Sequence, residues 1–126
     1  MAILHDVPGA EVTVNVGGDP LHEYTDSTLD EDDLTTTRYI EAASDQEFEV
    51  HITVDRRMRF LGDCIKVEVM TDGVIAHKPL IDKLAAKIIN TTISKGRSIG
   101  NRGVQNYRFA SLETGKNCVT GLRRAV

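Results

Sequence analysis

The chain has 126 residues, a length that suits a single domain, and its net charge at neutral pH is −4. Hydrophobic residues make up 40% of it and charged residues 27%, which is typical of a globular protein and excludes a disordered one. Residues 1–50 hold thirteen acidic residues and one basic residue, whereas residues 51–126 hold six acidic and fourteen basic ones, so the two parts carry −12 and +8. This division predicts charged faces or charged loops, or two parts that pair with each other within one sheet structure.

No targeting signal is expected at the start of the chain, because residues 1–8 lack a basic region and their apolar run stops at Leu4. No run of about eighteen apolar residues occurs, so we expect no membrane-spanning helix. Cys64 and Cys118 lie 54 positions apart and do not form a metal or disulfide framework. A disulfide between them is one alternative, but we predict free thiols and a cytoplasmic or nuclear location.

The first part of the chain predicts three strands. Residues 11–16 alternate strictly between valine and polar side chains, as a half-buried strand does, and residues 17–20 form a turn. Residues 36–42 are rich in β-branched and aromatic side chains, which favour a strand. Residues 47–54 are the clearest strand, with four side chains expected to face inward: Phe48, Val50, Ile52 and Val54. Only antiparallel sheets commonly keep one polar face, so we expect these strands to pair antiparallel.

The middle of the chain predicts a hairpin and a helix. Alternation resumes over residues 64–70, with Ile65, Val67 and Val69 inward. The sequence Thr-Asp-Gly at 71–73 then predicts a turn that returns through residues 74–76. After Pro79 the apolar residues change to helical spacing, which predicts a short helix near residues 80–90.

The last third of the chain predicts two further strands with a loop between them. Residues 91–94 favour a strand, and residues 104–112 predict another, with Tyr107 and Phe109 on the same side. Between them, residues 95–103 hold three glycines, one lysine and two arginines, a composition that predicts a mobile loop.

These elements together predict a mostly β fold, an antiparallel β-sandwich of the jelly-roll type with one short helix near residues 80–90. Residues 1–115 are expected to form the single domain. Residues 116–126 show no periodicity and predict an irregular C-terminal tail.

A pattern in the first fifty residues resembles a known family. It consists of Met1-Ala-Ile-Leu, Val7-Pro8-Gly9, the valines at 12, 14 and 16, and Thr37-Arg38-Tyr39-Ile40-Glu41-Ala42. Together with Phe109, Leu112, Glu113 and Thr114, it resembles an uncharacterised fungal domain family of unknown function over roughly residues 1–115. The resemblance implies a fungal source and a sandwich-like β fold, and it assigns no catalytic residue. Residues 116–126 depart from it where the family is usually longer, which indicates a divergent or truncated tail.

Candidate catalytic and metal-binding groups are few. The four histidines, His5, His22, His51 and His77, do not lie at a spacing that metal sites use. Cys64 follows Asp63, whose charge disfavours a reactive thiolate, so we expect a buried, inert thiol. The chain holds neither a Gly-x-Ser-x-Gly motif nor a His-Glu-x-x-His motif. We therefore predict no catalytic residue, no metal site, no cofactor and no enzyme activity.

The acidic stretch within residues 26–35 is the most suggestive feature of the sequence. It contains Asp30, Glu31, Asp32 and Asp33 but lacks the spacing of a calcium-binding loop. Its simplest interpretation is a solvated loop. Since like charges keep such a loop extended, it is also suited to bind a basic protein surface. We therefore predict a non-catalytic protein-interaction module, in which Arg56, Arg57 and Arg59 are the basic counterpart if the chain forms a homo-oligomer.

Nucleic-acid or phosphate binding through the basic glycine-rich loop 95–103 is the alternative. Lys95, Arg97 and Arg102 would contact the phosphates, and glycines allow backbone N–H groups to turn toward such an anion. The loop does not follow the Walker pattern. A pI near 5.5 and an aromatic content of 5% argue against a nucleic-acid partner.

Overall fold

A computed structural model describes residues 8–25, 35–83 and 89–110. The strands are β1 (Ala10–Val16), β2 (Asp19–Pro20), β3 (Glu23–Tyr24), β4 (Tyr39–Ile40), β5 (Glu47–Asp55), β6 (Cys64–Lys66), β7 (Val69–Thr71), β8 (Val74–His77), β9 (Leu80–Asp82), β10 (Ile89–Ser94), β11 (Gly96–Ser98) and β12 (Val104–Arg108), with one 3-10 turn, η2 (Gly100–Arg102). Six strands form the main sheet in the order β11-β12-β5-β1-β2, with β10 also paired to β5. Every pairing among the described strands is antiparallel, which confirms the predicted mostly β, antiparallel fold.

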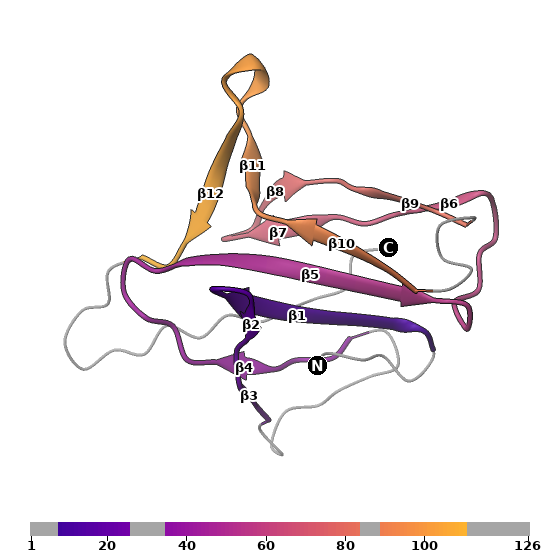
Figure 1. Cartoon of the computed structure of the whole chain (residues 1–126), viewed down its shortest axis with the longest axis horizontal. Helices are drawn as coiled ribbons and strands as arrows, with labels where there is room; N and C mark the ends of the chain where they lie inside the picture. The colour runs from indigo at the N-terminus through magenta and orange to yellow at the C-terminus, as the bar shows by residue number, and fades with distance from the viewer. Residues whose placement is uncertain (1–7, 26–34, 84–88, 111–126) are drawn as a thin grey trace.

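Strand β5 is the centre of the main sheet (Figure 1). It pairs with β1 along one edge, from Ala10 opposite Val54 to Asn15 opposite Glu49. Along its other edge it pairs with β10, from Ile89 opposite Asp55 to Ser94 opposite Val50. Alternation predicted β1 and β5, because side chains at every second position share one face of a pleated strand. The strand predicted over residues 91–94 lies within β10.

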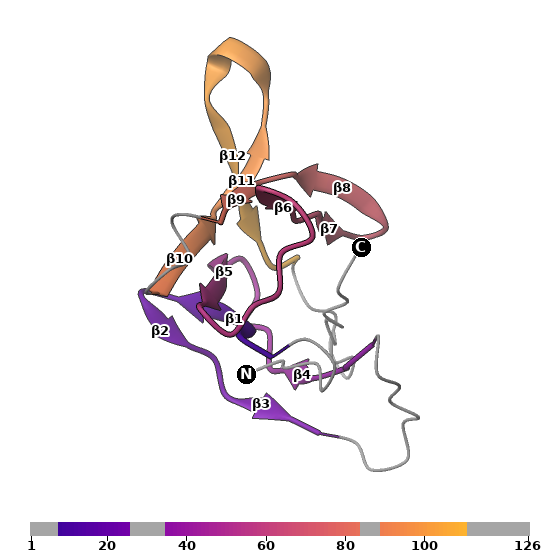
Figure 2. The same ribbon diagram turned by 90° about the vertical axis from the view of Figure 1, so that its right-hand side faces the viewer.

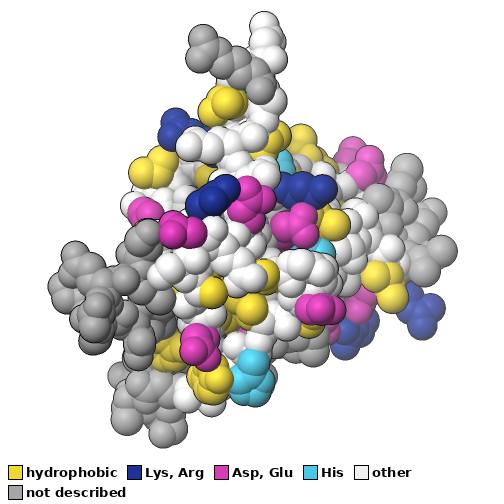
Figure 3. Space-filling view, turned by 60° about the vertical axis from the view of Figure 1, so that its left-hand side comes forward, with side chains coloured by type: hydrophobic (Ala, Val, Ile, Leu, Met, Phe, Trp, Pro, Cys, Tyr) yellow, Lys and Arg dark blue, Asp and Glu magenta, His cyan; other side chains and the backbone are white. Residues whose placement is uncertain are grey.

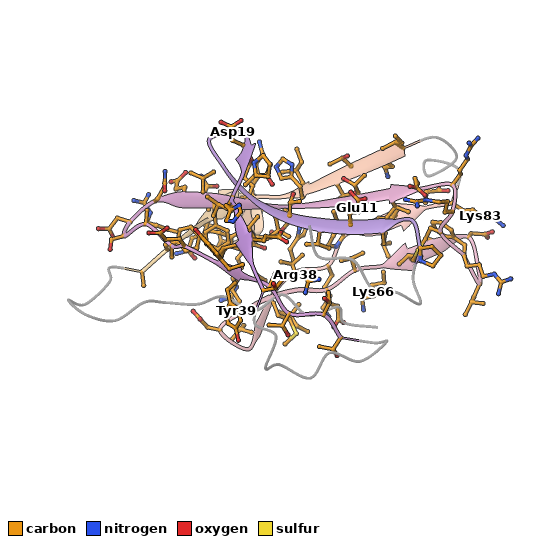
Figure 4. All side chains as sticks on the ribbon, turned by 90° about the horizontal axis from the view of Figure 1, so that it is seen from below. Glu11, Asp19, Arg38, Tyr39, Lys66 and Lys83 are labelled. Atoms are coloured by element: carbon orange, nitrogen blue, oxygen red, sulfur yellow. The ribbon has the colours of Figure 1, made fainter. Side chains whose placement is uncertain are left out.

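The hydrophobic core lies against one face of this sheet. The four inward residues predicted on β5 are all buried, as is Val14 on β1. The same cluster includes Ile40 from β4, Val69 from β7, Ile81 from β9, and the aromatic residues Tyr107 and Phe109. The polar face of β1 points the other way, and Figure 4 shows Glu11 on the side of the sheet opposite Lys66 of β6.

A long hairpin covers part of the core (Figure 2). It contains the pairs β6-β9 and β7-β8, which a backbone hydrogen bond from Val67 N to Pro79 O (2.9 Å) connects. Its turn has Asp72 at φ 51° and Gly73 at φ 79°. Two successive positive φ angles are those of a type I′ hairpin turn, so the turn predicted from Thr-Asp-Gly is confirmed. The strand predicted over residues 64–70 is divided between β6 and β7.

The short helix predicted near residues 80–90 is wrong at both of its ends. Leu80–Asp82 is β9, with Ile81 opposite Ile65 of β6, and Ile89–Ser94 is β10. Residues 84–88 lie outside the described residues. The apolar residues had helical spacing over too few turns to outweigh cross-strand pairing, and the β-branched residues at 89–93 favour a strand. The strand predicted over residues 36–42 is shorter than expected and contains β4 alone.

Within the described ranges the three short pairs, β3-β4, β6-β9 and β7-β8, do not join into one second sheet. The sandwich and its jelly-roll form therefore stay predictions, as does the boundary between a domain and a tail at residues 115–116. Among residues 8–25, 35–83 and 89–110, no helix combines the length and the apolar character that a membrane crossing requires.

The packing of the hairpin on the sheet predicts a contrast between two neighbouring residues. Ile81 is fully buried, whereas Leu80 beside it is 66% exposed. Ile81→Ala should lower the free energy of unfolding by about 2–5 kcal/mol, because it leaves a cavity in the core. Leu80→Ala should change it by no more than about 0.5 kcal/mol. Urea unfolding followed by circular dichroism measures both values, and equal losses would show that the hairpin is not packed through Ile81.

Candidate functional site

The most prominent surface feature is a two-stranded arm formed by β11, η2 and β12. Figures 1 and 2 show it standing away from the rest of the molecule. Arg97 of β11 lies opposite Gln105 of β12, and a hydrogen bond from Ile99 N to Gly103 O (3.0 Å) closes the tip. The mobile loop predicted for residues 95–103 is therefore wrong over 96–98, which form a strand. The glycines allow the tight tip, where Gly100 and Gly103 have φ 70° and 102°.

The arm begins where β5 changes its partner. β10 pairs with β5 up to Val50, and β12 takes over at Phe48, with Tyr107 opposite it. Between these points the two strands leave β5 and pair with each other, starting with a hydrogen bond from Tyr107 N to Lys95 O (2.9 Å). The chain can bend this sharply because Gly96 has no side chain: a Cβ there would overlap the backbone of Gln105 and Asn106.

Ion pairs hold the base of the arm on the polar face of β5. Lys95 Nζ lies 3.8 Å from Glu49 Oε2, and Arg108 Nη2 lies 2.9 Å from Glu47 Oε1. Asn106 Nδ2 donates a further hydrogen bond to Glu47 Oε2 (3.2 Å). These exposed pairs are individually weak, but together they connect both strands of the arm to the central strand.

The arm differs from the rest of the chain in charge. Residues 95–108 contain four basic residues and no acidic one, so a chain of net charge −4 carries −8 outside the arm. Two of the four, Lys95 and Arg108, are paired at the base. Arg97 belongs to β11, and residue 102 is the last of η2. The tip also exposes Ile99 and Val104. In Figure 3 the arm is the narrow projection at the top, and basic and acidic side chains alternate on the body below it.

A buried chain of hydrogen bonds lies directly beneath the arm. Ser94 Oγ is 2.8 Å from Tyr107 Oη and 2.8 Å from His77 Nδ1. Ser94 has no solvent exposure, and the Tyr107 ring stacks on Phe48 at 5.3 Å between centroids. The three residues come from β10, β12 and β8, so this chain connects the arm, the main sheet and the long hairpin.

Ser94 and His77 are residues of the types that form a serine nucleophile and its base, but a substrate cannot reach the Ser94 hydroxyl. A serine nucleophile must reach a bound substrate, and the Ser94 hydroxyl is closed off from solvent and shared with Tyr107. The arrangement fits a buried polar network that fixes how strands pack. This group was not predicted from the sequence. The signal was the alternation of residues 90, 92 and 94, which places Ser94 on the inward face with Val50.

The basic residues predicted as a homo-oligomer contact occupy the turn after β5. Arg57 forms a bidentate pair with Asp55, with Nη2 2.8 Å from Oδ2 and Nε 3.2 Å from Oδ1. Its backbone N–H also donates to Asp55 Oδ1 (2.9 Å). Arg56 and Arg59 are exposed on either side. The side-chain hydrogen bond from Arg57, followed by its backbone N–H, holds the pKa of the Asp55 carboxyl below its ordinary value.

The structure does not place the other predicted partner surface. Asp30, Glu31, Asp32 and Asp33 lie outside the described residues, as does Cys118. Lys95 and Arg97 belong to the arm, but Lys95 contacts Glu49 at the base while Arg97 lies further out on β11. The backbone N–H groups of Ile99 and Gly103 are used in closing the tip, so the loop does not direct them outward toward a phosphate.

The histidine and cysteine predictions have mixed outcomes. His51 faces away from the core, as expected, with Nε2 3.4 Å from Glu49 Oε1. Cys64 is a free cysteine but is exposed, so the expected burial is wrong: it begins the edge pair β6-β9 with its side chain on the outer side. In the part of the chain that the structure describes, no three histidine, cysteine, aspartate or glutamate side chains form a group that could hold a metal ion.

A family model for a domain of unknown function, DUF7918, matches residues 9–120 of this chain. The chain belongs to this family. The resemblance to an uncharacterised domain family is thus confirmed, while the fungal source it implied stays a prediction. No curated protein and no solved structure matches the chain. For a DUF7918 domain, the function must therefore be inferred from the site itself.

The buried hydrogen-bond chain predicts a selective loss of stability in this DUF7918 domain. Ser94→Ala leaves the hydroxyl of Tyr107 and the ring nitrogen of His77 without their partner, which should lower the free energy of unfolding by about 1–3 kcal/mol. Ser98→Ala, on the exposed arm, should change it by no more than about 0.5 kcal/mol. Urea unfolding of both variants tests this, and a neutral Ser94→Ala would show that the network does not stabilise the fold.

The Asp55–Arg57 pair predicts a pH effect. A carboxyl whose pKa is lowered by folding stabilises the fold above its unfolded pKa, and this contribution is lost as the pH falls through the folded pKa. Arg57→Gln removes the main cause and keeps the backbone hydrogen bond, so the NMR-monitored midpoint of Asp55 should rise part of the way to its ordinary value. Arg59→Gln is the matched control and should leave that midpoint where it is. A midpoint that is equal in the wild type and in Arg57→Gln contradicts the assignment.

Proposed function

We propose that the chain is a non-catalytic protein-interaction module whose contact element is the β11-β12 arm, and that the arm binds an acidic protein surface. One observation carries the proposal: a hairpin with basic residues and no acidic one projects from a body of net charge −8. A patch of one sign on a protein of the opposite sign steers a complementary partner to one place.

The exposed surface of the arm supports this function. A two-stranded hairpin without a core of its own is marginally stable in water. Here the base is fixed by Gly96, by Tyr107 and by two ion pairs, while Ile99 and Val104 near the tip remain exposed. Apolar side chains beside arginine are typical of the centre of a protein interface, where a partner completes the packing.

Nucleic-acid binding through the same arm is less well supported. Binding to single strands relies on aromatic side chains that stack on bases. Phe48, Tyr107 and Phe109 instead stack on one another in the core, with ring centroids 4.4 Å apart between Phe48 and Phe109. The −8 charge of the body repels any anionic partner, and it repels the dense charge of a phosphate backbone more strongly than that of an acidic protein segment. An acidic protein segment carries less charge than a nucleic acid and can also contact Ile99 and Val104.

The location in the cytoplasm or nucleus and the capture of a basic surface by Asp30, Glu31, Asp32 and Asp33 remain parts of the proposal. The exposed free thiol of Cys64 supports a reducing compartment. The acidic segment provides a separate site with the opposite preference, and a basic probe distinguishes it from the arm.

The test measures fluorescence anisotropy with three labelled probes: a glutamate-rich peptide, a lysine-rich peptide and a single-stranded oligonucleotide. We expect the acidic peptide to bind at low salt and to dissociate at high salt, because exposed charges are screened. The Arg97→Ala/Arg102→Ala variant should weaken this binding by roughly 5-fold, since each exposed ion pair contributes up to about 1 kcal/mol.

The matched control is Arg56→Ala/Arg59→Ala, which removes the same charge from the exposed turn after β5 and should leave the affinity for the acidic peptide nearly unchanged. Equal losses in the two variants mean that only net charge matters, and reject the arm as the contact element. Preferential binding of the oligonucleotide, lost with Arg97 and Arg102, supports the phosphate-binding alternative. Binding of the lysine-rich peptide that disappears when the four acids at 30–33 are neutralised assigns the function to the acidic segment.

A further inference from the structure

A second feature of the described strands is the outer edge of β10. Among the described strands, β10 pairs only with β5, so it ends the main sheet on that side (Figure 1). A strand at a sheet edge presents a row of backbone N–H and C=O groups that can pair with another strand.

The composition of β10 offers no protection against such pairing. Its six residues, Ile-Asn-Thr-Thr-Ile-Ser, contain no charged residue, proline or glycine in a chain that is 27% charged. Edge strands that must stay single usually carry a lysine, a proline or a bulge. The opposite edge of the same sheet has one of these features, a proline, since it ends in the two-residue strand β2, Asp19–Pro20.

The exposed side chains of β10 are those of an interface. Ile89 is 68% exposed and Ile93 is 43% exposed, with Thr91 between them on the face that points away from the core. β-branched residues are the ones that pair best across strands. The neighbouring strand contributes Thr53, whose hydroxyl lies 3.1 Å from that of Thr91.

We propose that two copies of this chain associate through β10, antiparallel and around a two-fold axis, so that the two main sheets become one continuous sheet. The occupant is a second copy because an uncharged strand is complementary to itself: antiparallel pairing centred on Thr91 places each Ile89 opposite the partner's Ile93. A contact of this kind is isologous, so it closes at two copies and does not continue into a filament.

This association is independent of the arm and has the opposite salt dependence. The paired strands carry no charge, whereas the whole chain carries −4, so screening by salt favours the dimer by reducing repulsion between copies. Binding of an acidic partner to the arm weakens under the same conditions. The failure of either proposal can therefore be recognised without the other.

Cysteine cross-linking tests the register. Thr91→Cys, in a Cys64→Ser/Cys118→Ser background, places two thiols opposite each other at about 4.5–5.5 Å between Cα atoms, within reach of a disulfide. We expect a covalent dimer on mild oxidation. Thr53→Cys in the same background is the matched control, because it removes the same Thr53–Thr91 contact but lies one strand further from the two-fold axis. Its Cα atoms are roughly 14 Å apart, too far to form a disulfide.

Light scattering after size exclusion tests the association itself. The wild type should have the mass of two chains and keep it at high salt. Ile93→Lys should give a monomer, because each lysine would then lie opposite the partner's Ile89 and its charge would lose solvent in an uncharged contact. Ile99→Lys changes an isoleucine of the same 43% exposure on the arm and should stay dimeric.

Each of three outcomes overturns the proposal: a monomeric wild type at the highest concentration reached, equal cross-linking of Thr91→Cys and Thr53→Cys, or dissociation by Ile99→Lys. The first means that another segment or a foreign strand covers β10, the second that contact is random, and the third that the arm joins the copies. Circular dichroism confirms that each variant is folded, so that loss of the dimer reflects the edge and not unfolding.

Discussion

The rest of the structure depends on a change of partner along one edge of β5. β10 pairs with β5 as far as Val50, and β12 begins at Phe48, so two strands converge where the edge has room for one. Backbone groups that leave a sheet must find other partners, and here β11 and β12 pair with each other and turn outward. Gly96 permits the close approach, and Ser94 connects the junction to His77 and Tyr107. The arm is thus a consequence of how the central strand is shared.

This origin explains how a hairpin without a core can hold its position. Its residues gain little by packing against one another, but its base is anchored in the core by Tyr107 and Phe109, which stack around Phe48. Above the junction, Lys95 and Arg108 are matched by Glu49 and Glu47, which leaves Arg97 beyond the acidic residues of β5. The position of the arm is set at the base, and Ile99 and Val104 in its outer part are exposed.

The sequence predicted the parts of this fold that depend on local pattern. Alternation located β1, β5 and the inward side chains of β5, and Thr-Asp-Gly located the turn before β8. The strand predicted over residues 91–94 lies within β10. Local pattern failed where pairing between distant segments decides: Leu80–Asp82 became a strand because β6 was available to it, and Cys64 lies on the outer side of that pair. Residues 95–103 predict a loop because their glycines suggest mobility, whereas Gly96 allows strands to approach. The other strand of the arm, β12, lies within the strand predicted over residues 104–112. No local signal shows that Ser94, His77 and Tyr107 meet.

The proposed pairing through β10 would fix the distance between the two arms of a dimer. An antiparallel pairing of β10 with its copy places the two Ser94 ends, and hence the two arms, at opposite ends of the shared strand pair. Six residues of strand span roughly 20 Å, so the arms of a dimer stand about that far apart on one rigid sheet. Two weak sites held at a fixed spacing bind a partner with two acidic segments far more tightly than either does alone, provided that the spacing matches. Single exposed arginines each contribute little to binding. Dimerisation through the uncharged edge of β10 would let two such weak sites bind one partner together, which raises both the affinity and the selectivity for a partner with matching spacing.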